Sequence, residues 1–193
     1  MRMKTKPPKA QGKSRKKYYI WLMGLMIIAI MIGSALDLWK EEDTAEGAYE
    51  YKGLKFTNTD AGWMAYKADN SRLLILTNPA ELANMTIPYV NTGLLKYYAK
   101  IYVTSDPTER VRIPMNQFFR NIPVNAIVVP ACPVDIEQCR EMPLKTCENA
   151  DKNTAVIFFK ESNETIVSFN NDCLVIQGKE LTKIVDKIVL ESI

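Results

Sequence analysis

The chain has 193 residues, of which 47% are hydrophobic and 24% charged, and its formal net charge is +3. This charge is uneven, because residues 1–17 contain eight basic residues and no acidic one, whereas residues 18–193 carry a net charge of −5. The length favours one globular domain with an appendage, and the mildly acidic main part lacks the basic surface that a nucleic-acid-binding domain needs. We therefore expect no nucleic-acid partner.

The basic segment leads directly into residues 18–36, nineteen consecutive residues without a charge. In a helix such a run extends roughly 28 Å, about the thickness of one hydrocarbon core. We predict a single transmembrane helix at 18–36, an uncleaved signal-anchor whose partner is the lipid bilayer. Basic flanking residues stay on the cytoplasmic side. The sequence thus predicts a cytoplasmic tail at 1–17, an acidic linker at 37–48 and an extracytoplasmic domain at 49–193 of a cell-membrane protein.

Two other interpretations of the same segment remain. A cleaved signal peptide would also begin with basic residues, and Gly33 and Ala35 would stand at the −3 and −1 positions of a cut before Leu36. The apolar run is, however, longer than the roughly 7 to 15 residues of such a peptide. A pilin-like leader would place a small residue between the basic and the apolar part, whereas Lys17 is followed directly by Tyr18.

The predicted outer domain consists of short strands and short helices. Antiparallel strands are expected around Tyr51 and Phe56, at 63–67 and at 72–77. Asn78 followed by Pro79 predicts a helix start. Further strands are predicted at 100–104, 125–129, 154–159, 165–169 and 173–176, with a short helix at 114–121. The last helix follows Gly178, with an apolar stripe of Leu181, Ile184, Val185, Ile188 and Val189. This order predicts an α/β fold in which one mixed sheet is covered by helices, the C-terminal one amphipathic.

All four cysteines lie in the predicted outer domain: Cys132, Cys139, Cys147 and Cys173. An even number in an oxidising compartment predicts two disulfides, for which three pairings exist. We favour Cys132 with Cys139, which closes a loop containing proline, and Cys147 with Cys173, which ties the exit of that loop to the last hairpin. The spacings do not fit the C-x2-C pairs of a zinc site or a redox motif.

Groups that carry out common enzyme chemistry are missing from the sequence. The chain has no histidine, which excludes Ser-His and Cys-His nucleophile pairs. It has no glycine-rich phosphate-binding motif. Asp135, Glu137 and Glu141 are carboxylates of the cysteine-rich loop, where we interpret them as ordinary surface acids. We expect no catalytic residues, no metal site and no cofactor.

Two sequons mark possible N-glycosylation at Asn84 and Asn163. Their position on the predicted outer side makes them usable, although a chain with thirteen asparagines contains such triplets by chance. The aromatic pairs Tyr97-Tyr98 and Phe118-Phe119 are expected to send one ring to the core and the other to solvent.

A resemblance to known proteins is carried by four segments, GLKFTNTDAGWMAYKAD, AKIYVTSDP, KTCENADKNTAVIFF and NDCLVIQGK. In these segments the chain resembles uncharacterised single-pass membrane proteins of small-genome archaea, over most of the outer domain. The resemblance implies a membrane topology and an archaeal host, and it implies no activity.

The expected function is that of a membrane-anchored structural or interaction protein, whose outer domain binds another protein of the cell envelope. An envelope hydrolase or transferase using carboxylates or a bound metal is the first alternative, for which two acids about 5 to 9 Å apart in a deep pocket are expected. An extracytoplasmic ligand-binding domain is the second, for which a mostly apolar concave pocket is expected.

Overall fold

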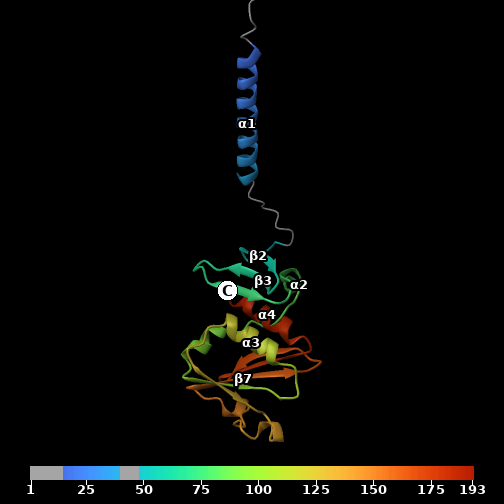
Figure 1. Ribbon diagram of the computed structural model, residues 1–193. Coiled ribbons are helices and arrows are strands. Elements are labelled where there is room, and N and C mark those ends of the chain that lie inside the picture. The colour runs from blue at the N-terminus through green and yellow to red at the C-terminus, as the bar shows by residue number, and fades with distance from the viewer. Residues whose placement is uncertain (1–14, 40–47) are drawn as a thin grey trace, which may run out of the picture. The chain divides into compact units, whose positions relative to one another are not determined.

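The computed structural model describes residues 15–39 and 48–193, with side chains at 18–32 and 48–193. The chain divides into two compact units, residues 1–45 and 46–193 (Figure 1). Most of the predicted basic tail and residues 40–47 of the predicted acidic linker lie outside the described residues.

The first unit contains one helix, α1 (Arg15–Trp39), which is 25 residues long and includes all of residues 18–36. Its large apolar side chains between Tyr18 and Ile32 are each 47–72% exposed. Among the residues that the structure describes, no helix combines the length and the hydropathy needed to cross a membrane.

The second unit begins with a four-stranded antiparallel sheet, the meander, whose strand order is β1-β2-β3-β4. Lys52 and Gly53 both have positive φ angles, which is the requirement of a two-residue turn whose twist matches its strands. Alternate residues of the later strands, Phe56, Ala65 and Leu73, are buried, as expected for a sheet with one covered face. The strands are β1 (Tyr49–Tyr51), β2 (Leu54–Thr59), β3 (Gly62–Tyr66) and β4 (Arg72–Ile75).

A second sheet has five strands in the order β6-β5-β7-β9-β8, and all neighbours are parallel except β8 and β9. The central strands are apolar and buried, which is typical of parallel strands. Asn171 and Asp172, both at positive φ, form the turn of the β8–β9 hairpin. The strands are β5 (Lys100–Thr104), β6 (Ile127–Ala131), β7 (Thr154–Glu161), β8 (Ile166–Asn170) and β9 (Cys173–Gly178).

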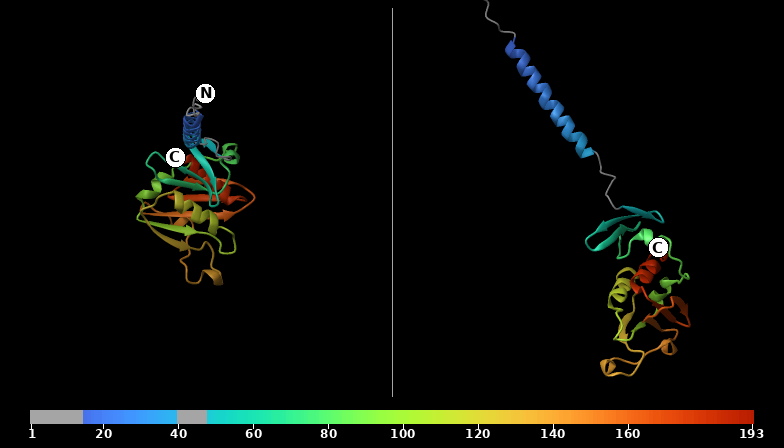
Figure 2. Two further views of the ribbon diagram at one scale, coloured as in Figure 1. Left: turned by 45° about the horizontal axis from the view of Figure 1, so that its top comes forward. Right: turned by 90° about the vertical axis from the view of Figure 1, so that its right-hand side faces the viewer.

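The two longest helices of this unit, α3 (Arg112–Asn121) and α4 (Leu181–Glu191), lie between the two sheets (Figures 1 and 2). Because α4 is covered from both sides, its buried residues extend well beyond the predicted apolar stripe and include Asp186 and Lys187. The short helix α2 (Pro79–Ala83) starts as predicted, with Asn78 Oδ1 accepting a hydrogen bond from the Ala80 N–H at 2.9 Å. Three 3₁₀ turns complete the unit: η1 (Thr92–Tyr97), η2 (Glu137–Cys139) and η3 (Cys147–Asn149).

The mixed α/β class is confirmed, but the expectation of a single sheet is wrong. The reason lies at the outer edge of β4, where side chains of the helices take the place of a neighbouring strand. Asn121 accepts a hydrogen bond from the Leu74 N–H (3.1 Å) and donates one to the Leu74 carbonyl (2.9 Å). Asp186 Oδ2 accepts from the N–H groups of Leu76 (3.0 Å) and Thr77 (2.8 Å). With these groups occupied, β4 cannot pair with a strand of the second sheet.

Gln117 joins the two halves of this polar network. Its Nε2 donates to the Leu74 carbonyl at 2.6 Å and to Asp186 Oδ1 at 2.8 Å. Gln117, Asn121 and Asp186 are all buried, at 7% exposure or less. We call these three side chains the edge network.

The beginning and the end of the unit are joined by a second polar cluster. Tyr51 Oη donates to Glu191 Oε1 at 3.0 Å, and Lys187 Nζ donates to Tyr51 Oη at 3.0 Å. Lys52 and Glu191 form an ion pair at 2.8 Å. The hydrogen bond from Lys52, followed by those from Lys187 and Tyr51, lowers the pKa of the Glu191 carboxyl to about 2. The first strand is therefore fastened to the last helix.

Candidate functional site

The four cysteines form two disulfides in the favoured pairing. Cys132 is bonded to Cys139 and Cys147 to Cys173, with Cα atoms 5.9 and 5.3 Å apart. They hold residues 132–150, which we call the disulfide arm, at the side of the five-stranded sheet that faces away from α3 and α4 (Figure 1). The second disulfide fastens the arm to the first residue of β9. The arm is thus a closed structural element with no thiol left for chemistry.

The strand next to the arm, β6, exposes apolar side chains but is a poor template for another strand. The Ile127 N–H donates to the Ala99 carbonyl, so the backbone groups of Val128 and Pro130 point to the outer edge. Pro130 has no N–H to offer there. Beyond it, the Cys132 N–H and carbonyl are already bonded to residues 143 and 145 of the arm. Proline and the arm together block strand addition at this edge.

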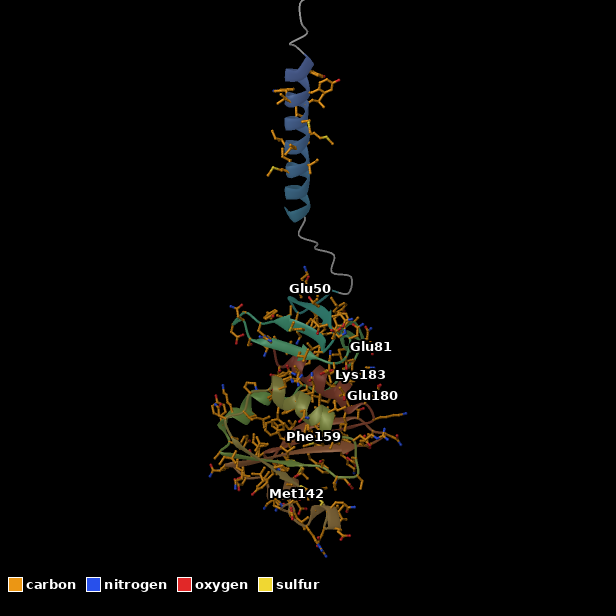
Figure 3. All side chains as sticks on the ribbon, viewed as in Figure 1. Glu50, Glu81, Met142, Phe159, Glu180 and Lys183 are labelled. Carbon is orange, nitrogen blue, oxygen red and sulfur yellow. A yellow bond between two sulfur atoms is a disulfide. The ribbon has the colours of Figure 1, made fainter. Side chains whose placement is uncertain are left out.

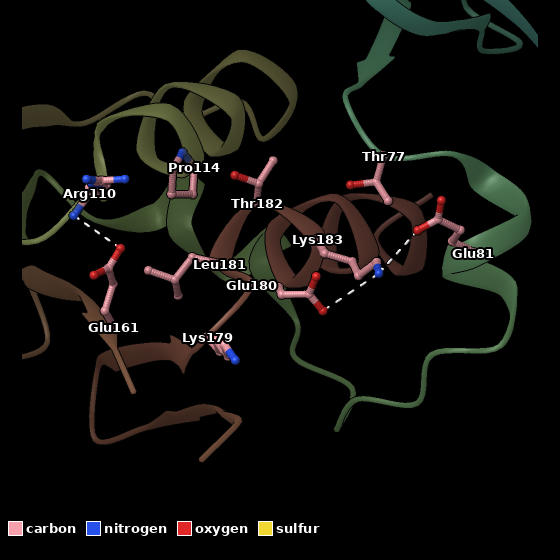
Figure 4. A pocket seen from close by; sticks show the side chains of 10 residues that line it. All are labelled: Thr77, Glu81, Arg110, Pro114, Glu161, Lys179, Glu180, Leu181, Thr182 and Lys183. Carbon is pink, nitrogen blue, oxygen red and sulfur yellow. Dashed lines mark hydrogen bonds and ion pairs between the residues drawn. The ribbon is translucent and has the colours of Figure 1, made fainter. Parts of the chain in front are cut away.

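A cleft with a volume of about 430 Å³ opens where three parallel strands end (Figure 4). β7 ends at Glu161 and β9 at Gly178, and α4 begins immediately beyond. In open α/β sheets this carboxyl edge is where ligands are usually bound. We call this cavity the carboxyl-edge cleft. Its walls come from α4, from α2 and from the residues that follow β5 and precede α3.

The charged side chains of the cleft are arranged around Lys183. Its Nζ lies 3.2 Å from Glu81 and 3.7 Å from Glu180, and the three residues lie together in Figures 3 and 4. The hydrogen bond to Glu81 and the charge of Glu180 raise the pKa of Lys183. On the other wall, Glu161 accepts a hydrogen bond from the Arg110 backbone N–H at 3.2 Å.

The cleft is charge-balanced, and the two acids that meet in it share one ammonium group. Three basic and three acidic residues line it, so their charges cancel. Glu81 and Glu180 both contact Lys183, and their side chains are 57% and 68% exposed. Exposed carboxylates around one ammonium are typical of a surface ion-pair network. The cleft residues can therefore make polar contacts with a ligand, and they do not identify a reaction.

Sequence reasoning missed these cleft residues because they come from separate elements. The spacing of Glu180 and Lys183, three residues apart at the start of α4, is the one signal that the sequence offers. The carboxylates considered at the sequence level, Asp135, Glu137 and Glu141, are exposed on the disulfide arm and do not line the cleft. Within the described part of the chain, no three His, Cys, Asp or Glu side chains are grouped as metal ligands.

The remaining candidate residues lie apart from one another. Asn84 ends α2 and Asn163 lies between β7 and β8, and both are exposed. Tyr97 is 73% exposed while Tyr98 packs against the core, as expected. Phe118 is fully buried and Phe119 partly buried, so the second pair turns both rings inward to different depths.

No protein-family model matches the chain, and no curated protein or solved structure matches it either. The interpretation of the molecule therefore rests on its own residues, and the resemblance to archaeal membrane proteins stays a hypothesis.

Proposed function

We propose that the protein is a membrane-anchored interaction module, with residues 18–36 in the lipid bilayer and residues 49–193 outside the cytoplasm, where they bind another protein of the cell envelope. The observation that carries the proposal is the contrast between the two units. One is a helix with exposed apolar side chains, and the other is a compact α/β unit with its own core and two disulfides.

The length of α1 supports the anchor. Its 25 residues extend about 37 Å at the rise of an α-helix, longer than a hydrocarbon core of about 30 Å. The uncharged run continues beyond Ile32, the last residue of α1 with a described side chain, to Leu36. Apolar side chains exposed to water along residues 18–32 are unfavourable, whereas lipid is a suitable solvent for them.

The disulfides support the outer location of the second unit. Disulfides persist in oxidising compartments and are rare in the cytosol. The excess of basic residues at 1–17 supports a cytoplasmic N-terminus. No observation in the described residues favours the hydrolase alternative, since the acids of the carboxyl-edge cleft form a surface ion-pair network.

Membrane insertion is tested by washing membranes of cells that express the full chain with alkaline carbonate. The wild-type protein should stay in the pellet, and a variant with both Ile27→Arg and Ile28→Arg should be released, because each charge costs about 2.5 to 3.5 kcal/mol at the centre of a span. Asn58→Arg, at an exposed position of β2, is the matched control and should behave like wild type. Release of the wild-type protein would contradict the anchor.

Topology and partner are tested on sealed cells. A membrane-impermeant amine reagent should label lysines in the second unit and spare those at positions 4–17; the reverse pattern would overturn the assignment. Cross-linking followed by mass spectrometry should recover a defined envelope protein, and recovery of the uncross-linked monomer alone would contradict the interaction role.

A further inference from the structure

A second cavity, of about 320 Å³, lies on another side of the α/β unit, where four segments converge. Lys67 follows β3, Thr92 and Lys96 lie on η1, Asn125 lies between α3 and β6, and Ser192 follows α4. These segments are far apart in the sequence, so the fold itself creates the cavity. We call it the lysine pocket.

The lysine pocket differs from the carboxyl-edge cleft in its charge. Lys67 and Lys96 line it, and no Asp or Glu side chain does. Neither ammonium lies within ion-pairing distance of a carboxylate among the residues with described side chains. Asp69 is near enough to Lys67 to have its pKa lowered by that charge, after the larger effect of its hydrogen bonds to Ser71, but it does not line the pocket.

The clearest sign of a built site is Thr92. This residue is only 3% exposed, and its hydroxyl forms no hydrogen bond with any described residue. Among the described residues, Thr104 holds the one fully buried side-chain oxygen without a partner, so the Thr92 oxygen keeps contact with the surface, where Thr92 lines the lysine pocket. Asn121, in the same wall, is fully used by contrast, since its amide bonds to Leu74 and Gln117. Thr92 therefore has a free donor at the surface of a cavity that Lys67 and Lys96 also line, although the Lys96 ammonium lies 4.9 Å from the centre of the Tyr97 ring.

Helix ends do not cancel this positive charge. The C-terminal ends of α3 and α4 reach the pocket at Asn121 and Ser192, and each helix end contributes about half a negative charge. The two lysines carry two full positive charges. The balance of the wall is positive, which favours an anion.

We propose that the lysine pocket binds an oxyanion of the phosphate class. Lys67 and Lys96 supply charge, the Thr92 hydroxyl donates a hydrogen bond, and the exposed Asn125 amide supplies a further donor at the rim. The ligand is a free phosphate, a phosphate ester or the phosphate of a lipid headgroup, which share this chemistry. The inference does not depend on the membrane anchor, because the pocket lies wholly within the second unit.

The test measures ligand binding to the full chain in a neutral detergent by isothermal titration calorimetry. Inorganic phosphate represents the free ion, and glycerophosphoglycerol represents a lipid headgroup as a soluble phosphodiester. Sodium chloride at equal ionic strength separates specific binding from screening. Binding of phosphate alone assigns the pocket to a free phosphate or monoester, and binding of the diester assigns it to a headgroup.

Three variants decide whether binding occurs in this pocket. Thr92→Val keeps the shape of a buried side chain and removes the donor, and Lys67→Met removes a charge; each should weaken binding about tenfold, the effect of 1.4 kcal/mol. Lys179→Met, in the carboxyl-edge cleft, should leave binding unchanged. Circular dichroism of each variant checks that it is folded. Absence of binding by both anions, or equal weakening in all three variants, would overturn the proposal.

Discussion

Removal of the Asp186 carboxylate should separate the meander from the rest of the α/β unit. Asp186 is fully buried on α4 and accepts hydrogen bonds from the N–H groups of Leu76 and Thr77 and from the side chain of Gln117. In Asp186→Ala these three donors lose their acceptor together. The meander is then held to the helices by its apolar contacts, by the bonds of Asn121 and Gln117 to Leu74, and by the cluster of Tyr51, Lys52, Lys187 and Glu191.

The size of the effect follows from the number of donors left without a partner. A buried donor that loses its acceptor costs about 1 to 3 kcal/mol. Leu76 is exposed and Thr77 is only partly buried, so water can replace part of what their N–H groups lose, and we expect a total loss of about 3 to 5 kcal/mol. A domain of this size has roughly 5 to 15 kcal/mol of stability, so the variant should be marginal.

Urea unfolding followed by circular dichroism measures this loss, and hydrogen exchange locates it. Exchange should accelerate first in the meander, at the N–H groups of Leu76 and Thr77, and later in β7 and β9. Glu180→Ala, at the exposed position directly before the same helix, is the control and should change stability by less than about 0.5 kcal/mol. A loss below about 1 kcal/mol in Asp186→Ala would refute the role of the edge network.

The same carboxylate has a distinct pH dependence. Burial raises the pKa of Asp186 above its ordinary value of 3.8, although its hydrogen bonds with Thr77, Gln117 and Leu76 act in the opposite direction. Its contribution to stability is therefore full below that value and is lost as the pH rises through the folded-state pKa. Asp186→Asn does not titrate. Its stability relative to wild type should thus increase as the pH rises above about 3.8, and a constant difference would contradict the raised pKa.

Three further predictions concern the disulfides and two polar side chains. Cys173→Ser should lower the free energy of unfolding by roughly 3 to 4 kcal/mol, because its disulfide closes a loop of about 27 residues. Cys139→Ser, which opens the shorter loop, should lower it by roughly 2 to 3 kcal/mol. Equal melting temperatures of the two variants would contradict loop closure as the cause. Glu191→Gln should remove stability that is full above pH 4.5 and is lost as the pH falls through about 2. The loss should be about 1 to 2 kcal/mol at pH 7 and should disappear in more acidic solution. Tyr98→Phe should cost about 1 kcal/mol by removing the 2.6 Å hydrogen bond to Asp172. Burial raises the pKa of Tyr98 to about 12, so an ultraviolet titration should lose its latest-titrating phenol in that variant.

Local signals in the sequence predicted most of the elements. Asn78 and Pro79 marked α2 because an Asn side chain caps the free N–H groups of a helix and proline fits its first turn. Between the predicted strands at 165–169 and 173–176, Asn171 and Asp172 form the hairpin turn because Asn and Asp tolerate positive φ angles. The predicted strand at 125–129 was displaced by two residues from β6 (Ile127–Ala131), where Pro130 obscured the strand pattern.

The division into two sheets could not be predicted from such signals. It depends on Gln117, Asn121 and Asp186, which are polar residues that ordinarily face solvent. They are buried here because α3 and α4 are covered on two sides and because each has a partner on the edge of β4. The lysine pocket could not be predicted for the same reason. Lys67 and Lys96 line one cavity only when the fold brings η1 and the turn beyond β3 together.

The position of α4 has a consequence for how the unit folds. The last helix of the chain lies in its middle layer, and it bonds to residues of the first strands that precede it by more than one hundred positions, such as Tyr51 and Leu76. Loop closure over such separations adds only about 0.6 kcal/mol per doubling of length, so it delays folding more than it weakens the fold. Until α4 is in place, the outer edge of β4 lacks the Asp186 acceptor and both sheets lack part of their cover. The Cys147–Cys173 disulfide holds the start of β9, the strand directly before α4, against the arm. Formation of this disulfide therefore restricts the unfolded chain directly before α4, ahead of the step in which the helix reaches its position.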